Sequence, residues 1–277
     1  MSLSIPNSFV RQYEKEVHVA YQQTGSQLRN TVRNKNSIVG KSTTFQKVGK
    51  GVAGTKTRHG KVPVMNIDHE PVECILQDWY AGDYVDALDE LKTHVNERQV
   101  TQDAASYALG RKTDELILEA LQANTSITKI ADGSTIMTKK IGQLGLEIFG
   151  NNRVPVGDRV AFVGWRQWGE LLDIDEFANS DFVGPDGLPW KVGGAQGKVW
   201  LGTLWMPTDI LPFDAATGKR TCYWWHKTAI GHASGKDVSV QISWENTSAA
   251  YFVNANMSQG ACVIDPMGII SFDCDES

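Results

Sequence analysis

The stretch VTQDAASYALGRKTDELILEALQAN, residues 100–124, decides the fold that the rest of the chain must fit. It contains no proline, consists mainly of good helix formers, and repeats small or apolar side chains at helical spacing. The sequence therefore predicts one helix of roughly 36 Å, at about 1.5 Å per residue, which is well above the mean helix length. The stripe expected to be buried comprises Ala105, Leu109, Leu116, Ile117, Ala120 and Leu121.

Residues 36–77, upstream of this helix, have the pattern of a β-hairpin. Alternating side chains predict strands at Thr43–Val48, Lys61–Ile67 and Val72–Leu76, and glycines separate the first two. This spacing indicates a long two-stranded excursion with a flexible tip. Because an isolated hairpin is at best marginally stable in water, we expect another surface to hold it in place.

The charge of this hairpin differs from that of the whole chain, whose net charge is −5. Residues 17–67 hold nine Lys and Arg and no Asp or Glu, whereas residues 68–277 hold 16 Lys and Arg against 30 Asp and Glu. Such a segment is a solvated basic loop, a nucleic-acid surface, or a contact with the acidic body of a neighbouring copy. Composition does not choose among these. The basic residues of the hairpin are Lys41, Lys47, Lys50, Lys56, Arg58 and Lys61.

Beyond residue 132 the pattern becomes α/β. The sequence predicts a helix at Ile136–Phe149, a buried strand at Arg159–Gly164 and a short helix at Trp165–Leu172. Strands at 197–206 and 221–225 follow, and then a strand-rich tail with segments at 238–244, 249–253, 261–264 and 269–272. Nine tryptophans, several in pairs, favour a protein that works through its surfaces.

No pattern in the chain predicts a catalytic, cofactor or metal site. The glycines of residues 49–54 spell GxGxxG, but no helix opens directly after them to hold a pyrophosphate. Cys222, His226 and His232 lack the paired ligand spacing of structural zinc. We therefore expect no enzyme activity, no cofactor and no metal.

No window reaches the roughly 18–20 apolar residues that cross a bilayer, and residues 1–16 lack the pattern of a secretion signal. We expect a protein that is made in the cytoplasm and does not bind membranes. In a reducing compartment the four separated cysteines are expected to be free thiols: Cys74, Cys222, Cys262 and Cys274.

The order of these parts resembles the major capsid proteins of tailed bacteriophages, which have the Hong Kong 97 type fold. YALGRKTDELILEAL, residues 107–121, resembles the spine helix of their peripheral domain. RVAFVGWRQWGELLDIDEFANSDF, residues 159–182, resembles the strand and helix of their axial domain. Residues 198–212 and 222–238 are similar to a recurring stretch in one subgroup, and residues 255–274 to the C-terminal strands.

The resemblance implies an α+β fold in which an arm and an extended loop precede two domains. Its expected parts are an N-terminal arm (1–35), an extended β-hairpin loop (36–77), a peripheral domain with the spine helix at about 100–124 (78–132), a mainly axial α/β domain (133–236), and C-terminal strands returning to the peripheral domain (237–277).

The resemblance also implies a function. It predicts a major capsid protein that self-assembles as hexamers and pentamers into an icosahedral phage head around double-stranded DNA, bound without sequence specificity. Expected partners are a separate scaffolding protein, a portal and a decoration protein, and the expected location is the virion, after synthesis in the host bacterial cytoplasm. In this interpretation the six basic loop residues, Trp79 and Tyr80 contact the adjacent subunit, and Arg29, Arg33 and Lys35 of the arm face the DNA.

Three other functions fit parts of the sequence. An encapsulin-like nanocompartment shell shares the fold and would enclose a cargo enzyme. A nucleic-acid-binding protein would use the basic segment and bind with a steep salt dependence. An α/β enzyme would bind a small ligand saturably. The last two explain neither the long helix nor the unsupported hairpin.

Overall fold

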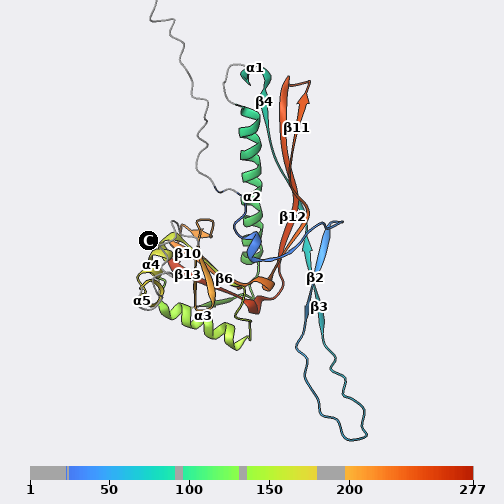
Figure 1. The fold of residues 1–277 in the computed structure, drawn as a ribbon, viewed down its shortest axis with the longest axis vertical. Coiled ribbons are helices and arrows are strands. Elements are labelled where there is room, and N and C mark those ends of the chain that lie inside the picture. The colour runs from blue at the N-terminus through green and yellow to red at the C-terminus, as the bar shows by residue number, and fades with distance from the viewer. Residues whose placement is uncertain (1–22, 24, 91–95, 131–135, 180–196, 277) are drawn as a thin grey trace, which may run out of the picture. The chain divides into compact units, whose positions relative to one another are not determined.

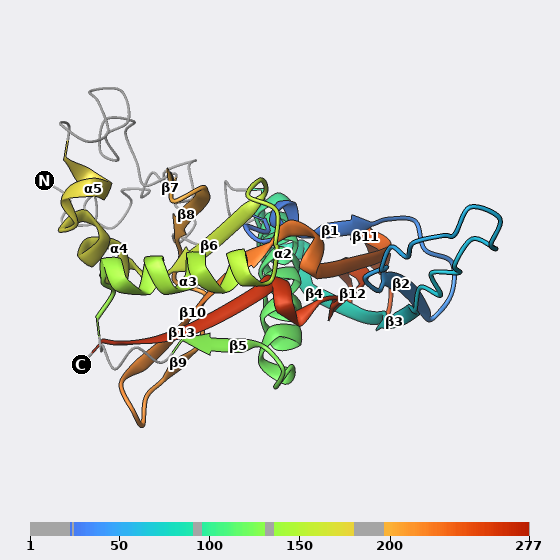
Figure 2. The ribbon, with the colours of Figure 1, turned by 90° about the horizontal axis from the view of Figure 1, so that it is seen from below.

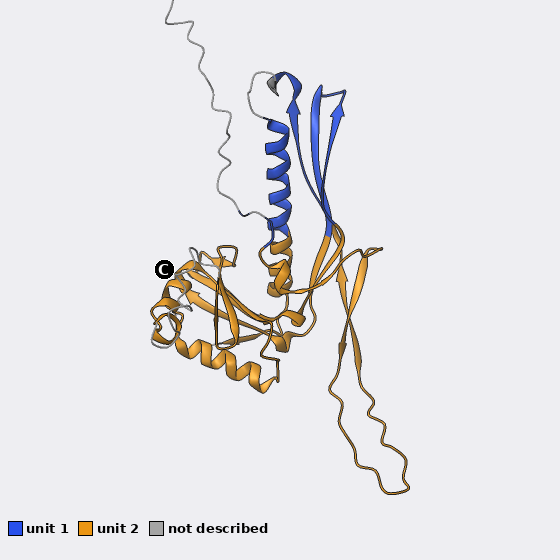
Figure 3. Ribbon diagram, viewed as in Figure 1, with its two compact units in different colours: residues 1–26, 78–112, 237–258 blue, residues 27–77, 113–236, 259–277 orange. Residues whose placement is uncertain are grey.

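The computed structural model describes residues 23, 25–90, 96–130, 136–179 and 197–276 (Figure 1). The chain divides into two compact units (Figure 3). Of the predicted arm, residues 1–22 and 24 lie outside the described residues. Unit 1 comprises residues 1–26, 78–112 and 237–258, and unit 2 comprises residues 27–77, 113–236 and 259–277.

The predicted long helix is confirmed as α2, Glu97–Ala123, which has 27 residues. It begins three residues earlier than expected because the Asn96 side chain accepts a hydrogen bond from the Gln99 amide, at 3.3 Å, as an N-cap does. Gly110 lies in the middle of the helix, where glycine usually weakens it. A Cβ at Gly110 would lie 2.7 Å from the Gly25 Cα, so close backbone packing within unit 1 requires a glycine there.

The apolar stripe of α2 contributes to two separate cores. In unit 1, Leu109 is buried with Ala255 and Met257, and Ala105 packs against them. In unit 2, other stripe residues enter the large core. Ile117 and Leu121 are buried in this core. Leu116 is also buried, and Ala120 is half-buried.

Asp114 of α2 was not part of the predicted stripe, although it is 1% exposed. Its carboxylate accepts hydrogen bonds from the backbone amides of Gln27 and Leu28, at 2.9 and 3.0 Å. The helix thus fixes the chain at residues 27 and 28 through a charged acceptor, and this contact lies within unit 2.

One sheet has the order β1-β11-β12-β4. The short strand β1 pairs in parallel with β11, with Arg33 opposite Gly231. The two predicted tail strands at 249–253 and 261–264 belong to one continuous strand, β12. Gly260 lies within β12, where its backbone approaches that of Ile75. A Cβ at Gly260 would lie 2.0 Å from the Ile75 carbonyl oxygen, so a glycine is required there. The strands are β1 (Arg33–Lys35), β4 (Gln77–Asp86), β11 (Ile230–Glu245) and β12 (Ala250–Val263).

The seven-stranded sheet of unit 2 has the order β5-β13-β10-β6-β8-β7, with β9 beside β10. The central strand β10 is antiparallel to both β13 and β6, and β6 is parallel to β8. The predicted strand at 197–206 is two strands, because Leu201 and Gly202 turn the chain at φ 52° and 68°. The strands are β5 (Thr128–Ile130), β6 (Arg159–Val163), β7 (Lys198–Trp200), β8 (Thr203–Pro207), β9 (Phe213–Asp214), β10 (Lys219–His226) and β13 (Ile269–Asp275).

Helix α3 lies against this sheet (Figure 2). The predicted helices at 136–149 and 165–172 are confirmed as α3 (Lys139–Asn151) and α4 (Trp165–Leu172). The remaining helices of the described residues are short: α1 (Ala87–Glu90), α5 (Asp175–Ala178), and 3-10 turns at Arg29–Thr31, Lys227–Ala229 and Pro266–Gly268.

The tryptophan pairs lie mainly in the core of unit 2, so most of these side chains are not available at the surface of the described chain. Trp205, Trp224 and Trp225 are fully buried. Trp224 packs edge-on against Phe149 of α3, with ring centroids 5.0 Å apart. Aromatic side chains bury large apolar areas, and a small residue, Gly145, makes room for Trp224 under the helix.

The extended loop begins with β2 (Ser42–Val48) and ends with β3 (His69–Ile75), which pair antiparallel from Ser42–Ile75 to Val48–His69. The predicted strand at 61–67 is wrong. Pairing stops where the Gly49 amide donates to the Asp68 carbonyl, at 2.8 Å, so residues 61–67 have no strand beside them. Figure 1 shows the paired strands opening into an unpaired loop.

Two boundaries between the units, at residues 77/78 and 236/237, coincide with boundaries predicted from the sequence, whereas others do not. One lies within α2, at residues 112 and 113, and another within β12, at residues 258 and 259. Sequence boundaries are drawn at turns and changes of composition, whereas here one long helix and one long strand each belong to both units. No helix among the described residues is long and apolar enough to cross a membrane.

The packing of α3 generates a prediction. In Gly145→Ala the added Cβ would lie 2.2 Å from the Trp224 ring, which is fully buried and cannot move away. Overpacking of this kind costs about 1–3 kcal/mol, more than the roughly 1 kcal/mol that alanine gains over glycine in a helix. We expect a lower urea midpoint of unfolding.

The matched control is Gly150→Ala in the same helix, where a Cβ would meet no atom within 4 Å. This variant should be as stable as the parent or slightly more stable. Equal urea midpoints for the two variants would contradict the packing argument.

Candidate interaction surface

The root of the extended loop is fixed to unit 2 by a small apolar cluster. Phe45, Cys74 and Leu76 are buried there with Ala233 and Ile264. Backbone hydrogen bonds at the same place include the one from the Leu76 amide to the Lys41 carbonyl, at 2.9 Å. The paired part of the loop is therefore part of the fold of unit 2.

Beyond the root, residues 49–68 are exposed, except that Gly60 is half-buried. Val52, Val62 and Val64 expose 80%, 71% and 83% of their surface. None of them belongs to a hydrophobic cluster of the described residues. The loop thus presents apolar side chains that its own described chain leaves uncovered, a feature that the charge pattern did not reveal.

Lys47 differs from the other predicted basic residues of the loop. Its ammonium nitrogen lies 3.3 Å from a carboxylate oxygen of Asp265 and 3.9 Å from one of Glu70, its partner across the strands. Lys47 therefore helps to fix the root within its own chain. The other five are exposed and have no ion pair with the described residues: Lys41, Lys50, Lys56, Arg58 and Lys61.

Trp79 and Tyr80 lie on opposite faces of β4. Trp79 is half-buried against the core of unit 1, and the Lys112 ammonium lies 4.3 Å from its ring centroid. Tyr80 is 71% exposed. Of the two, Tyr80 is therefore available at the surface, whereas Trp79 packs within its own unit.

The three cations expected to face DNA lie in two neighbouring elements. Arg29 is half-buried in a 3-10 turn. Arg33 and Lys35 lie in β1 and approach the ring of Phe45, at 5.7 and 6.0 Å from its centroid. Lys35 also donates to the Thr43 hydroxyl, at 2.6 Å. The structure thus places two of the three at the root of the loop.

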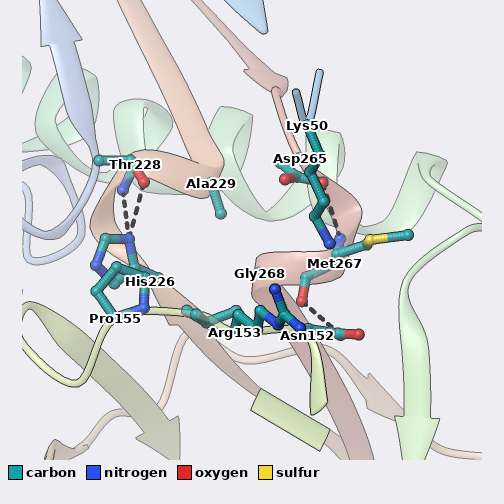
Figure 4. A pocket seen from close by; sticks show the side chains of 11 residues that line it. Lys50, Asn152, Arg153, Pro155, His226, Thr228, Ala229, Asp265, Met267 and Gly268 are labelled. Carbon is teal, nitrogen blue, oxygen red and sulfur yellow. Dashed lines mark hydrogen bonds between the residues drawn. The ribbon is translucent and has the colours of Figure 1, made fainter. Parts of the chain in front are cut away.

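A cavity of about 230 Å³ lies beside the loop, within unit 2 (Figure 4). Its lining includes Lys50 from the loop, Arg153 after α3, and Asp265. Asp265 accepts a hydrogen bond from the Met267 amide, at 3.2 Å, and pairs with Lys47. No pattern in the sequence indicates this cavity, because its walls come from four separate segments.

His226 forms one wall of this cavity and is 7% exposed. Its Nδ1 accepts a hydrogen bond from the Thr228 amide and lies 2.8 Å from the Thr228 hydroxyl. Burial lowers the pKa of His226 below 6.5, and the nearby Asp158 carboxylate opposes this effect. The imidazole is therefore neutral at pH 7 and acts as a structural acceptor.

The other residues weighed for zinc are engaged elsewhere. The ring nitrogens of His232 lie 3.0 and 3.1 Å from the side-chain oxygens of Asn34 and Gln259. Cys222 and Cys274 are adjacent free thiols, and a hydrogen bond with Cys222 together with burial raises the pKa of Cys274. Among the described residues no three His, Cys, Asp or Glu side chains are grouped so that they could hold a metal ion.

Comparisons with known proteins find the same architecture elsewhere. A family model described as phage capsid protein matches residues 5–276. A structure from Mycobacterium phage Che8 is 18% identical, with a TM-score of 0.75 over 96% of this chain and 97% of that chain. The capsid of cyanophage P-SCSP1u is 18% identical, with a TM-score of 0.77 over 100% and 96%. The capsid of a native GTA particle is 11% identical, with a TM-score of 0.67 over 99% of each chain. No curated protein matches the sequence.

The environment of His226 predicts a pH dependence of stability. Because the pKa is lower in the folded state than in the unfolded state, the unfolded chain takes up the proton first as the pH falls. Neutral His226 makes its full contribution to the free energy of unfolding above about pH 6.5. This contribution is lost as the pH falls from there through the lowered pKa of the folded state. His226→Asn keeps an acceptor for Thr228 but does not titrate in this range.

Urea unfolding of the parent and of His226→Asn between pH 8 and pH 5 measures this effect. The stability advantage of the parent should shrink as the pH falls below about 6.5. Parallel stability curves for the two proteins would rule out the role assigned to His226.

Proposed function

Since the chain belongs to the phage capsid protein family, we propose that its extended loop joins copies of the chain into a closed shell. The protein is a major capsid protein, a structural component of the virion, and its role is non-enzymatic. The encapsulin-like alternative is not favoured, because the matching family is one of phage capsid proteins.

The observation that carries the proposal is the uncovered loop. A hairpin with three exposed valines and no second layer gains stability when another surface covers it, and its five exposed cations are available for contact with acidic groups of that surface. Complete burial of one valine contributes about 1.5–3 kcal/mol, whereas an exposed ion pair contributes about 0–1 kcal/mol. The valines therefore supply most of the affinity, and the cations guide encounter and register.

The units share the boundaries at residues 77/78 and 236/237 with the domain scheme implied by the sequence, which supports an assignment of the domains. We assign unit 1 to the peripheral domain, with α2 as its spine helix, and the seven-stranded sheet of unit 2 to the axial domain around the centres of hexamers and pentamers. Closed shells of identical copies require repeated contacts between the same surface patches. The loop roots would then lie at equivalent positions in every copy of an icosahedral head.

The remaining partners follow from the same proposal. The head encloses double-stranded DNA, and contacts with its phosphates carry no sequence information. Cations of the N-terminal part, including Arg29, would face this DNA. Assembly uses a separate scaffolding protein, a portal and a decoration protein, and takes place in the host bacterial cytoplasm.

The proposal predicts the effect of reversing charge in the loop. In Lys56→Glu with Lys61→Glu, both substituted side chains are exposed and lie outside the root cluster, so the soluble fold should be unchanged. Each reversal replaces attraction to an acidic neighbour by repulsion. We expect the yield of closed shells, measured by sedimentation and negative-stain microscopy, to fall about tenfold or more.

Lys56→Arg with Lys61→Arg is the matched control, since it keeps both charges and should assemble. Circular dichroism of both double variants tests the fold. Normal shells from the glutamate variant, with undiminished resistance to salt and heat, would refute the proposed role of the loop.

A further inference from the structure

Among the described residues, the strand orders of the two larger sheets end at four strands, β1 and β4 in one and β5 and β7 in the other, and the two-residue strand β9 flanks β10 beside the second path. An edge strand presents unpaired N–H and C=O groups, and proteins usually protect such edges by making them short or by placing Lys on them. Three of the four edges are protected in this way. β1, β5 and β7 have three residues each, and they contain Arg33 and Lys35, Lys129, and Lys198.

β4 has neither protection. It has ten residues, of which seven are exposed, and it contains no Lys or Arg. Its sheet neighbour on one side is β12, and no strand of the described chain pairs with its other edge. A long exposed edge of this kind is a site where another chain can add a strand.

The side chains of β4 show what kind of chain fits. Tyr80 and Tyr84 expose 71% and 54% of their surface on one face, where the ring of Tyr84 packs against Phe252 at a centroid distance of 4.7 Å. Asp78 and Asp83 are exposed and have no cationic partner among the described residues. The edge therefore suits a strand with apolar side chains on one face and cations nearby.

The chain itself contains a segment with these properties. Residues 36–67 hold six Lys and Arg and no Asp or Glu, whereas β4 holds three Asp and no Lys or Arg. The sign of the charge thus reverses between the loop and β4. Opposite charge over two separate segments favours contact between the loop of one copy and β4 of another.

We propose that the free edge of β4 is the acceptor for the unpaired part of the loop, residues 50–65, of a second copy. This rests on the proposed function of the loop and names the surface that receives it. The added strand gains main-chain hydrogen bonds along β4, and Pro63, which lacks an N–H, forgoes one of them.

The alternation of side chains in a strand fixes the pairing further. Val62 and Val64 share one face of the added strand, and Lys61 points to the other. On β4, Tyr80 and Tyr84 share a face, and Asp83 lies on the opposite one. The register that sets the valines against the tyrosines therefore also brings Lys61 to the side of Asp83.

A charge swap tests this assignment with four proteins: the parent, the loop variant Lys56→Glu with Lys61→Glu, the edge variant Asp78→Lys with Asp83→Lys, and the variant with all four changes. Each double variant should lower the yield of shells about tenfold or more, and the fourfold variant should recover to within about threefold of the parent. Sedimentation and negative-stain microscopy measure the yield.

The outcomes separate the two proposals. If the loop variant assembles normally, the proposed function of the loop fails. If the loop variant is defective and the fourfold variant is no better, the loop has another acceptor and the β4 assignment fails. Asp173→Lys with Asp209→Lys, exposed in unit 2, is the control: if it rescues the loop variant equally, the rescue reflects net charge and the assignment is overturned.

A cysteine cross-link keeps the test valid should the edge variant fold poorly. Val62→Cys with Tyr84→Cys leaves every charge in place, and both positions are exposed. Mild oxidation of assembled protein should give covalent multimers on a non-reducing gel, and each single cysteine variant should stay monomeric. If the double variant gives monomers and no covalent multimers, the assignment is overturned.

Discussion

A two-stranded hairpin has no second layer against which to bury its side chains, and this constraint shapes the whole molecule. The chain satisfies it at the root, where Phe45 and Leu76 enter a small core and Lys47 pairs with Asp265. It does not satisfy it beyond Gly49, where strand pairing ends and the valines stay exposed. The fold therefore holds one end of the loop firmly and leaves the side chains beyond Gly49 uncovered by the described chain.

The division between root and exposed part also divides the charges by role. Lys47, Arg33 and Lys35 contact groups of their own chain at the root. The cations beyond the root have no described partner of opposite charge. A single count of basic residues hides this difference, because a cation that is already paired adds little to attraction between copies.

Helix α2 contributes side chains to the cores of both units. Its stripe supplies Leu109 to one core and Ile117 to the other. Thr113 is the first residue of α2 that belongs to unit 2, and it takes part in a buried hydrogen-bond network. Its hydroxyl donates to the Gln259 side chain at 2.8 Å, and the same Gln259 oxygen lies 3.1 Å from a ring nitrogen of His232. Such a satisfied buried network specifies one arrangement of its strands more sharply than apolar packing does.

Local patterns in the sequence were sufficient for the elements that depend on near neighbours. The long helix, α4, the root strands and the segregation of charge all follow from spacing, propensity and composition, and the family resemblance joined them into one fold. The tertiary structure alone decided which side chains remain available. In the tertiary structure Trp79 is half-buried whereas Tyr80 is exposed, and Lys47 forms an ion pair with Asp265. Two predicted tail segments form the single strand β12, and residues 61–67 are not part of a strand. These outcomes depend on contacts between residues far apart in the chain, and no local pattern contains that information.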